Sequence, residues 1–506
     1  MPLVIERDRE KDVGVDSEKG SMKHSSSVST KEVSTNTKAE NATSWAGTTA
    51  EKRLVRKLDM RIMPLTCIAY FFAFLDRSNP GNGRLQGLPE DVLHGDPTGK
   101  LFDLISSGFF LSYIVCQIPA TVALKLFPSR IWLGCAIMGW GLASTLGAAA
   151  FNFSGLFISR IFVGIFEAGF TPAVPVYCSF WYTRYEMGRR MAFWFSFSTI
   201  GGALGGLIAF GIQNAHTTIS NWRLLFIVEG IATVLIGLLT LVFLPNRPEE
   251  TGFLSGEERE IQRERSSRGV KPDVGRFLVK KHALYAFKDW RVYVAGGIQL
   301  MANCSTGAIA AFLPTILKTF GVSDASAQLL TVPPYAVGAA VLIMTSHFSD
   351  HYQTRGIFVS AAATVGAIGH LLLLTVHENV HVRYFAVFCV ISGTYTCIGI
   401  LIAWTTNNFG SETKKATGMP IYMSIGQCGS VLGSHIFPST EGPRYIKGFA
   451  ISCALEFLAA ICGIILTVSY RLDNRRKNKK YGIPNPDVEV DTDELADKAP
   501  MFRYIP

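Results

Sequence analysis

Apolar runs of about 20 residues recur along the chain, and no other feature restricts its fold as strongly. A helix needs a run of that length to cross the ~30 Å hydrocarbon core of a bilayer. Composition agrees, because 48% of the 506 residues are hydrophobic and 17% are charged, against roughly 25% charged in an ordinary soluble domain. We therefore predict an all-α membrane protein with about twelve transmembrane helices. The predicted spans centre on residues 62–79, 103–124, 131–150, 155–178, 190–212, 224–244, 291–313, 326–347, 357–376, 384–406, 417–437 and 448–470.

Polar segments divide these spans into two sets of six. Residues 1–57 are rich in Ser, Thr, Lys and Glu with few aromatic residues, which predicts a disordered tail. Residues 246–289 form a charged central loop, and residues 473–506 form a second polar tail. The sequence thus predicts two six-helix bundles, over residues 58–245 and 290–472.

Lys and Arg collect in the loops on one side of the predicted spans. They precede the first span (52–61), lie between the fourth and fifth (184–190) and follow the last (475–480), whereas the opposite loops are almost free of them. The positive-inside rule then places both tails and the central loop in the cytosol. We expect a multi-pass protein of the plasma membrane. Because this asymmetry accounts for the net charge of +9, we expect no nucleic-acid partner.

Residues typical of enzymes and metalloproteins are missing from the pattern. The ten cysteines include no CxxC pair, so neither a zinc site nor a disulfide framework is indicated. We find no catalytic-triad signature, no phosphate-cradling loop and no cluster of metal ligands. The sequence predicts a protein that is not an enzyme and holds no metal or cofactor.

Two loops in corresponding places of the two halves resemble each other. The segment SHFSDHYQTRG after the eighth span carries Asp350 five residues before Arg355, and LKLFPSR after the second span carries Lys125 five residues before Arg130. Internal repeats of this kind are usual in transporters. The pair resembles the loop signature of the major facilitator superfamily, which would latch helix ends by charge and helix-dipole contacts. A plain basic loop remains an alternative for the first copy.

The fourth predicted span, with SRIFVGIFEAGFTP, contains two charged residues seven positions apart. Seven positions turn a helix through roughly 700°, so Arg160, Gly164, Glu167 and Thr171 share one face. A charge in mid-membrane costs several kcal/mol unless it faces a partner or water, which makes a functional role the first hypothesis. The alternative is a structural ion pair between helices.

The outer end of the first span supplies two more charges, in YFFAFLDRSNPGNG. Asp76 lies at about the depth of Arg160, so we predict that their side chains pair. Arg77 is turned about 100° from Asp76 and is expected to point into a cavity between the bundles. An arginine can hold a carboxylate by two hydrogen bonds, and buried carboxylates can carry protons. Two acids and two arginines at these depths are typical of a coupled anion carrier.

Asp76-Arg77 together with Arg160-x-x-x-Gly164-x-x-Glu167 resembles the anion:cation symporter family of the major facilitator superfamily. LDRSNPGNGRLQGL, NWRLLFIVEG and LPNRPEETGFLSGEER are similar to its fungal branch of allantoate, nicotinate and pantothenate permeases. The resemblance implies that Asp76 and Glu167 bind protons. It further implies that Arg77 binds a substrate carboxylate and that Arg160 is a switchable partner of Asp76. Pro80 stands where the fungal relatives usually carry an aliphatic residue, so we expect the outer end of the first helix to bend differently from theirs.

Other polar residues within spans are candidates for lining a central site. For each of them, hydrogen bonding between helices is an equally good explanation. These candidates are Tyr113, Ser196, Ser198, Asn303, Trp404, Asn407, Tyr422 and Gln427. Glu229 and Glu456 belong to the sixth and twelfth spans, which suggests packing roles.

The expected function is proton-coupled symport of a small organic anion, such as a vitamin or a nitrogen-source acid, by alternating access. The expected partners are that anion and the lipid bilayer, the coupling ion is the proton, and the expected state is a monomer. Two alternatives stay open. An exporter would use the same fold with the opposite net flux, and a nutrient sensor would bind substrate without carrying much of it.

Overall fold

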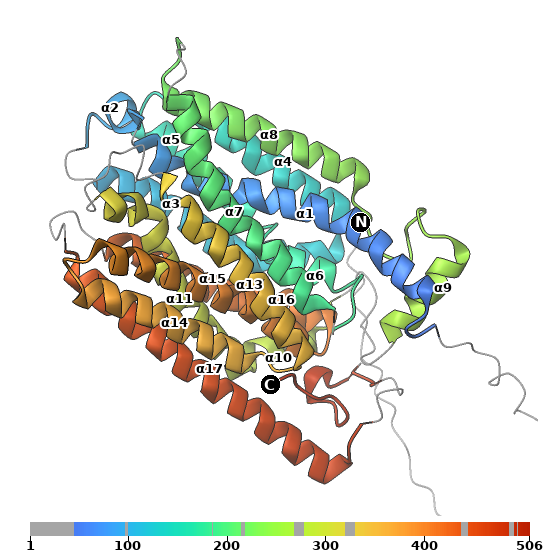
Figure 1. The fold of residues 1–506 in the computed structure, drawn as a ribbon. Coiled ribbons are helices and arrows are strands. Elements are labelled where there is room, and N and C mark those ends of the chain that lie inside the picture. The colour runs from blue at the N-terminus through green and yellow to red at the C-terminus, as the bar shows by residue number, and fades with distance from the viewer. Residues whose placement is uncertain are drawn as a thin grey trace, which may run out of the picture. The chain divides into compact units, whose positions relative to one another are not determined.

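The computed structural model describes residues 45–84, 86–96, 100–184, 186–213, 218–267, 278–318, 329–436, 444–484, 490–492 and 494–506. Their regular structure is almost wholly helical (Figure 1). The elements of the first half are α1 (Thr49–Arg84), α2 (Leu88–Val92), α3 (Lys100–Leu126), α4 (Ser129–Gly147), α5 (Phe153–Glu167), α6 (Ala173–Cys178), α7 (Met187–Gln213) and α8 (Asn221–Phe243). They are followed by α9 (Gly256–Ser267), α10 (Lys280–Lys288), α11 (Trp290–Lys318), α13 (Val332–His351), α14 (Gly356–Thr375), α15 (Val380–Asn408), α16 (Glu412–His435), α17 (Ile446–Tyr481) and the short η2 (Ala496–Lys498).

Seven of these helices are long and apolar enough to cross a membrane, by length and composition alone: α1, α3, α7, α8, α14, α15 and α17. The other predicted spans coincide with α4, with α5 and α6 together, and with α11, α13 and α16. At 1.5 Å per residue, the 36 residues of α1 extend roughly 54 Å. This helix is therefore much longer than a bilayer core is thick.

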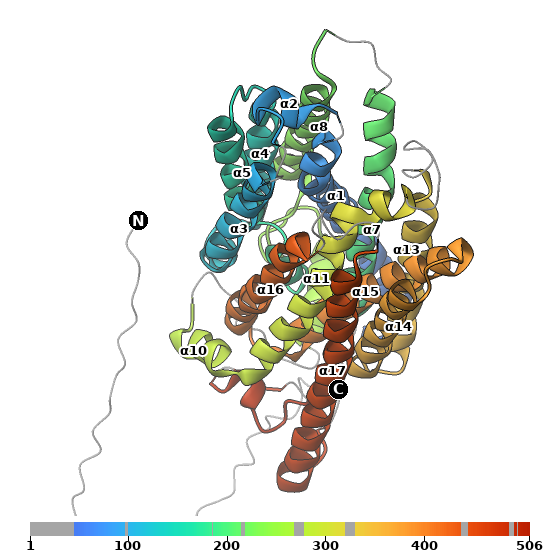
Figure 2. The same ribbon diagram turned by 90° about the vertical axis from the view of Figure 1, so that its left-hand side faces the viewer.

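The long helices pack in two groups that follow the chain. In the first half, α4 packs against α8, α3 against α5, and α1 against α7 and α8. In the second half, α11 packs against α16, and α14 packs against both α15 and α17. The helices coloured blue to green and those coloured yellow to red accordingly gather on separate sides (Figure 2). The groups meet where α7 packs on α13 and α15, and where α3 packs on α16.

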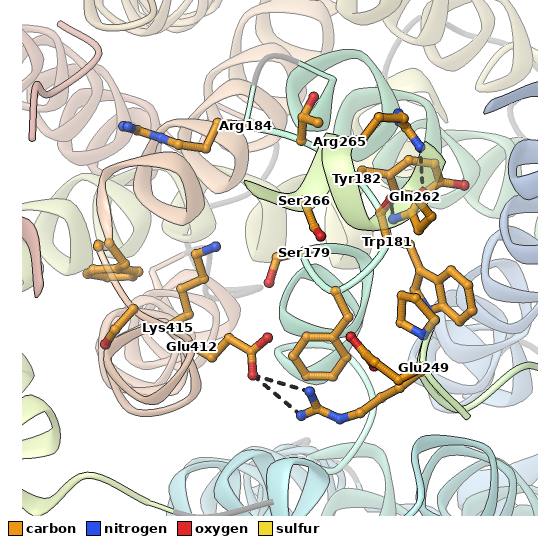
Figure 3. Close-up of a pocket in the computed structure, with 17 residues that line it drawn as sticks. Ser179, Trp181, Tyr182, Arg184, Glu249, Gln262, Arg265, Ser266, Glu412 and Lys415 are labelled. Atoms are coloured by element: carbon orange, nitrogen blue, oxygen red, sulfur yellow. Dashed lines mark hydrogen bonds and ion pairs between the residues drawn. The ribbon is translucent and has the colours of Figure 1, made fainter. Parts of the chain in front are cut away.

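Ionic contacts join the two halves at the end of the molecule where α1 begins and α17 ends, which we call the basic end. Glu412 at the start of α16 accepts two hydrogen bonds of 3.4 Å from the Arg247 guanidinium (Figure 3). Its Oε2 atom also lies 3.9 Å from Nζ of Lys125, at the end of α3. Lys125 is fully buried and donates to Thr413 Oγ1 over 2.8 Å. The halves are thus held together at the basic end by charges that solvent hardly reaches.

The predicted latch pair lies at the same end. Arg355 Nη2 is 2.7 Å from Asp350 Oδ1. A Cβ atom on Gly188, at the start of α7, would lie 2.0 Å from that carboxylate, so glycine permits the first half to approach the pair closely. The matching residue of the first copy does not act in this way, because the Arg130 side chain is exposed and its backbone N–H donates to Asn246 Oδ1 over 3.1 Å. A latch role of Arg130 therefore stays a prediction, and in this structure the residue makes a loop contact through its backbone.

The predicted limits of the N-terminal tail and the central loop need correction. Helix α1 begins at Thr49 instead of after residue 57, because its first turns dock onto α9, where Glu51 pairs with Arg265 over 3.2 Å. The central loop contains two helices, α9 and α10, one at each end. Residues 1–44 of the predicted tail lie outside the described residues.

At the other end of the molecule, α2 is fastened to the start of α8 by Asp91. Its Oδ2 atom accepts hydrogen bonds from the Trp222 indole over 2.8 Å and from the Ser220 hydroxyl over 2.7 Å. These two hydrogen bonds hold the pKa of the Asp91 carboxyl below its usual range, and the bond from the Trp222 indole has the larger effect. The contact anchors the loop that follows α1.

The C-terminal segment, residues 494–506, was predicted to be part of a polar tail, but it packs against the helix ends. Phe502, Tyr504 and Ile505 are buried. The Trp404 indole donates to the Ile505 carbonyl over 2.8 Å, and Lys414 pairs with Asp497 over 2.7 Å. Apolar side chains at the end of the chain explain this difference, because burying them stabilises the folded segment.

Deleting residues 494–506 is expected to lower the melting temperature of the detergent-solubilised protein by about 5 °C or more, because several buried polar groups would lose partners worth ~1 kcal/mol each. Trp404→Phe, which removes one donor and keeps an aromatic ring, should lower it by less. Trp290→Phe is the matched control, since Trp290 is 49% exposed. An unchanged melting temperature in the deletion would contradict the packing.

Candidate functional site

A cavity with an empty volume of about 1240 Å³, including its open mouth, lies between the two halves. Its walls come from α1, α3, α5 and α7 on one side and from α11, α15 and α16 on the other. The lining residues lie in the middle of these helices and toward the end opposite the basic end. The cavity is therefore closed at the basic end, where the ionic contacts of Glu412 join the halves.

Arg77 brings a positive charge to the cavity wall. Its guanidinium pairs with the Glu167 carboxylate, with Nε donating to Oε1 over 2.5 Å. Nη2 also donates to Thr171 Oγ1 over 3.2 Å and to the Tyr113 hydroxyl over 3.3 Å. The Arg77 side chain is 19% exposed whereas Glu167 is completely buried behind it. The second oxygen of Glu167, Oε2, has no hydrogen-bond partner among the residues that the structure describes.

The predicted ion pair between the side chains of Asp76 and Arg160 is not formed. Arg160 Nη1 donates to the main-chain carbonyl of Asp76 over 2.9 Å. The Asp76 carboxylate instead accepts hydrogen bonds from Ser144 Oγ over 2.6 Å and from Thr233 Oγ1 over 3.2 Å. Hydroxyl groups on α4 and α8 draw this carboxylate toward the interior of the first half. Asp76 and Arg160 are both buried there.

The fourth predicted span is interrupted at the site. Helix α5 ends at Glu167, a series of turns follows, and α6 begins at Ala173. Pro172 precedes α6 and has no N–H group to continue the hydrogen-bond ladder of α5. Broken helices in membrane proteins are tolerated where they line a cavity, and they often carry its binding groups. Here the break places Glu167 and Thr171 around Arg77.

Four of the six residues predicted to bind substrate line the cavity and two do not. Arg77, Ser198, Asn303 and Gln427 line the cavity. Tyr113 lies behind the wall in contact with Arg77. The predicted position of Trp404 is corrected, because its buried indole points to the C-terminal segment and not to the cavity.

Sequence reasoning missed several residues of the wall. Aromatic side chains form much of it: Tyr70, Phe74, Phe109, Phe110, Phe195 and Tyr395. Gln299, one turn before Asn303 on α11, lines it as well. A signal existed for Gln299, because an amide four residues from another amide in an apolar span places both on one helix face. The aromatic residues carried no such signal, since they resemble any lipid-facing or core residue.

Comparison with known proteins identifies the family. The family model of the Major Facilitator Superfamily matches residues 66–434, which is most of the chain. The chain belongs to the major facilitator superfamily. The predicted all-α major facilitator fold is therefore confirmed, and so is the prediction that the protein is a transporter and not an enzyme.

Other members of the superfamily resemble this transporter along nearly its whole length. It is 32% identical over 476 residues to the major facilitator-type transporter hxnP of Emericella nidulans, covering 92% of this chain and 96% of the relative. It is 33% identical over 443 residues to the MFS transporter prlL of a fungal species, covering 86% and 89%. The similarity to these relatives shows that this protein is a membrane-embedded, multi-pass transporter.

Solved structures of the superfamily share the fold at low sequence identity. The proton:xylose symporter XylE aligns with a TM-score of 0.63 and 14% identity, over 84% of this chain and 96% of that one. The human organic anion transporter MFSD10 aligns with a TM-score of 0.61 and 14% identity, over 80% and 99%. At such identity these likenesses show the fold alone.

Proposed function

We propose that this transporter is a proton-coupled symporter of a small organic anion, of the anion:cation symporter type. The observation that carries the proposal is the pairing of Arg77 with Glu167 at the cavity wall. Arg77 is partly exposed to the cavity, and its present partner is a carboxylate. A carboxylate substrate that enters the cavity would compete with Glu167 for the same guanidinium.

Charge balance links this competition to a proton. With Arg77 and Glu167 paired, the site is neutral. When Glu167 takes a proton and a substrate carboxylate replaces it on Arg77, the site is neutral again. Binding the anion alone or the proton alone leaves a net charge within the membrane, which costs several kcal/mol. The proton and the anion therefore bind together, which is the requirement for symport.

Asp76 and Arg160 have a supporting part in this scheme. Arg160 is held by the Asp76 carbonyl, and its guanidinium lies over the Phe109 ring, 5.4 Å from the ring centroid. The same ring lies 5.9 Å from the guanidinium of Arg77. Arg160 thus adds positive potential beside the anion site, while Asp76 is a second buried carboxylate that can accept a proton.

Alternating access requires that the contacts at the basic end break. We place this end in the cytosol of a plasma-membrane protein, because its loops carry the Lys and Arg excess. The cavity then faces outward, and opening to the cytosol separates Glu412 from Lys125 and Arg247. Labelling of engineered cysteines near either terminus from outside intact cells would contradict this orientation.

The test uses purified protein in liposomes and a panel of labelled monocarboxylates, each matched with its neutral amide. We expect at least one carboxylate to accumulate under an inward proton gradient and to equilibrate without accumulation when the gradient is collapsed. Its amide should not be carried, because it cannot balance the charge of Arg77. Equal uptake with and without the gradient, or equal uptake of acid and amide, would contradict the proposal. Liposomes without protein are the control.

A further inference from the structure

A cluster of amide groups lies on the wall of the cavity formed by the second half. Gln299 and Asn303 of α11 are 5% and 7% exposed, and both line the cavity. Gln299 Nε2 donates to Asn303 Oδ1 over 3.4 Å, and Asn303 Nδ2 donates to the Gly426 carbonyl over 3.0 Å. On α16, Ser430 donates to Gln427 Oε1 over 3.4 Å. Four polar side chains from two helices therefore line this wall, and the Asn303 hydrogen bond to the Gly426 backbone joins the two helices.

One acceptor in this cluster is left without a donor. Gln299 Oε1 is buried and has no hydrogen-bond partner among the described residues. A buried carbonyl oxygen that lacks a donor costs free energy, which a suitable ligand can recover. A Cβ atom on Gly426 would lie 2.1 Å from Gln299 Cγ, so the stem of Gln299 is pressed against α16. Because the stem is fixed, the terminal amide is the part that can turn toward a ligand in the cavity.

The amide cluster and Arg77 belong to different halves of the transporter. Arg77 comes from α1 of the first half, and the cluster comes from α11 and α16 of the second. A ligand that contacts both halves is bound more tightly when they close around it, whereas a ligand held by Arg77 alone gains little from closure. Only differential affinity for the closed state shifts the conformational equilibrium. The far end of the substrate thus influences whether a bound anion is also transported.

We propose, on the basis of the function proposed above, that the transported anions are bifunctional: a carboxylate for Arg77 and a hydrogen-bond donor for Gln299 Oε1. An amide N–H, an amine N–H or a hydroxyl group fits this acceptor. The aromatic residues of the cavity wall, including Phe109 and Tyr395, suit a flat apolar middle portion. Gln299 is then a specificity-determining residue and Asn303 positions it through their shared hydrogen bond.

The experiment compares two nearly isosteric probes in proteoliposomes with an inward proton gradient. 4-Carbamoylbenzoate carries a terminal NH₂ donor, and 4-acetylbenzoate replaces that NH₂ with a methyl group. We expect the wild-type transporter to carry the carbamoyl compound about tenfold faster, since a polar site discriminates against a ligand that leaves its acceptor unpaired. Both compounds should compete for binding, because both present a carboxylate to Arg77.

Gln299→Met keeps the length of the side chain and removes the amide. This variant should carry both probes at similar rates and should bind both with affinities close to those of the wild type. The matched control is Gln86→Met, since Gln86 lies outside the cavity and its Oε1 atom is also without a partner among the described residues. The control should keep the tenfold preference.

Two failures are distinguishable. If the wild type carries both probes equally, or if Gln299→Met keeps the preference, the bifunctional substrate is wrong and the symport of a carboxylate stands. If neither probe binds and no carboxylate accumulates under the proton gradient, the anion site at Arg77 is wrong, and the inference about Gln299 falls with it.

Discussion

Arg77→Lys is expected to weaken carboxylate binding by about tenfold to a hundredfold, although the charge is kept. Arg77 uses two nitrogen atoms to contact Glu167, Thr171 and Tyr113 from fixed directions. A lysine offers one ammonium group, which cannot reproduce the planar fork of a guanidinium. Each lost hydrogen bond to a charged group is worth ~1.5–3 kcal/mol. The measurement is the affinity of the purified variant for a labelled carboxylate that the wild type carries.

A substitution on the same helix provides the control for this prediction. Arg84, the last residue of α1, lies over the Phe102 ring at 5.0 Å and is not part of the cavity wall. Arg84→Lys should leave carboxylate affinity unchanged. If Arg77→Lys binds the carboxylate as tightly as the wild type while both variants are correctly folded, Arg77 is not the anion ligand.

The sequence singled out the charged residues of the first and fourth spans, but it did not predict which of them meet. Depth along a helix follows from residue counting at 1.5 Å per residue, and facing follows from the helical period. By this count Glu167 lies roughly 10 Å deeper than Arg160, yet the Arg77 guanidinium reaches the Glu167 carboxylate, and Arg160 binds the Asp76 carbonyl. The hydrogen-bond partners of these residues could not be predicted from the sequence, because a long arginine side chain can reach more than one acceptor within a few ångströms. The similar depth of Asp76 and Arg160 suggested an ion pair, yet the hydroxyl groups of Ser144 and Thr233 donate hydrogen bonds to the Asp76 carboxylate instead.

Small polar residues in apolar helices are the main reason for this difference. Ser144, which is followed by Thr145, and Thr233 lie in apolar stretches and look like ordinary packing residues in the sequence. Their role depends on how α4 and α8 rotate toward α1, which neither periodicity nor composition determines. The interruption between Glu167 and Ala173 was equally hidden, although Gly169 and Pro172 offered a local signal for it.

The C-terminal segment illustrates a limit of composition. Averaged over residues 473–506 the sequence is polar, which predicts a solvated tail. Phe502 and Tyr504 are nevertheless buried. The Tyr504 ring packs on the Tyr470 ring of α17, and Trp404 and Asn474 donate hydrogen bonds to the backbone of residues 504 and 505. These contacts are made by residues distant in the sequence, so the packing of the short segment cannot be recognised from its own composition.

Glu167→Gln is expected to abolish proton-driven accumulation while leaving exchange intact. Glutamine imitates the protonated carboxyl, so Arg77 is permanently available to the substrate. The site is then neutral with the anion bound, but it keeps an unbalanced Arg77 charge when empty, which opposes the empty return across the membrane. Uptake driven by an inward proton gradient should fall to about a tenth or less, since the coupling step is lost. Exchange of external labelled anion for internal unlabelled anion should continue.

The pH dependence of binding provides a second measurement on the same variant. In the wild type, raising the pH ionises Glu167, which then competes for Arg77 and weakens binding of the carboxylate. In Glu167→Gln this competition is absent, so affinity should hardly change with pH. Glu250→Gln, in the loop after α8, is the control and should behave as the wild type does. Full gradient-driven accumulation in Glu167→Gln would mean that Glu167 is a structural partner of Arg77, and that the proton travels through Asp76, for which Asp76→Asn is the next variant.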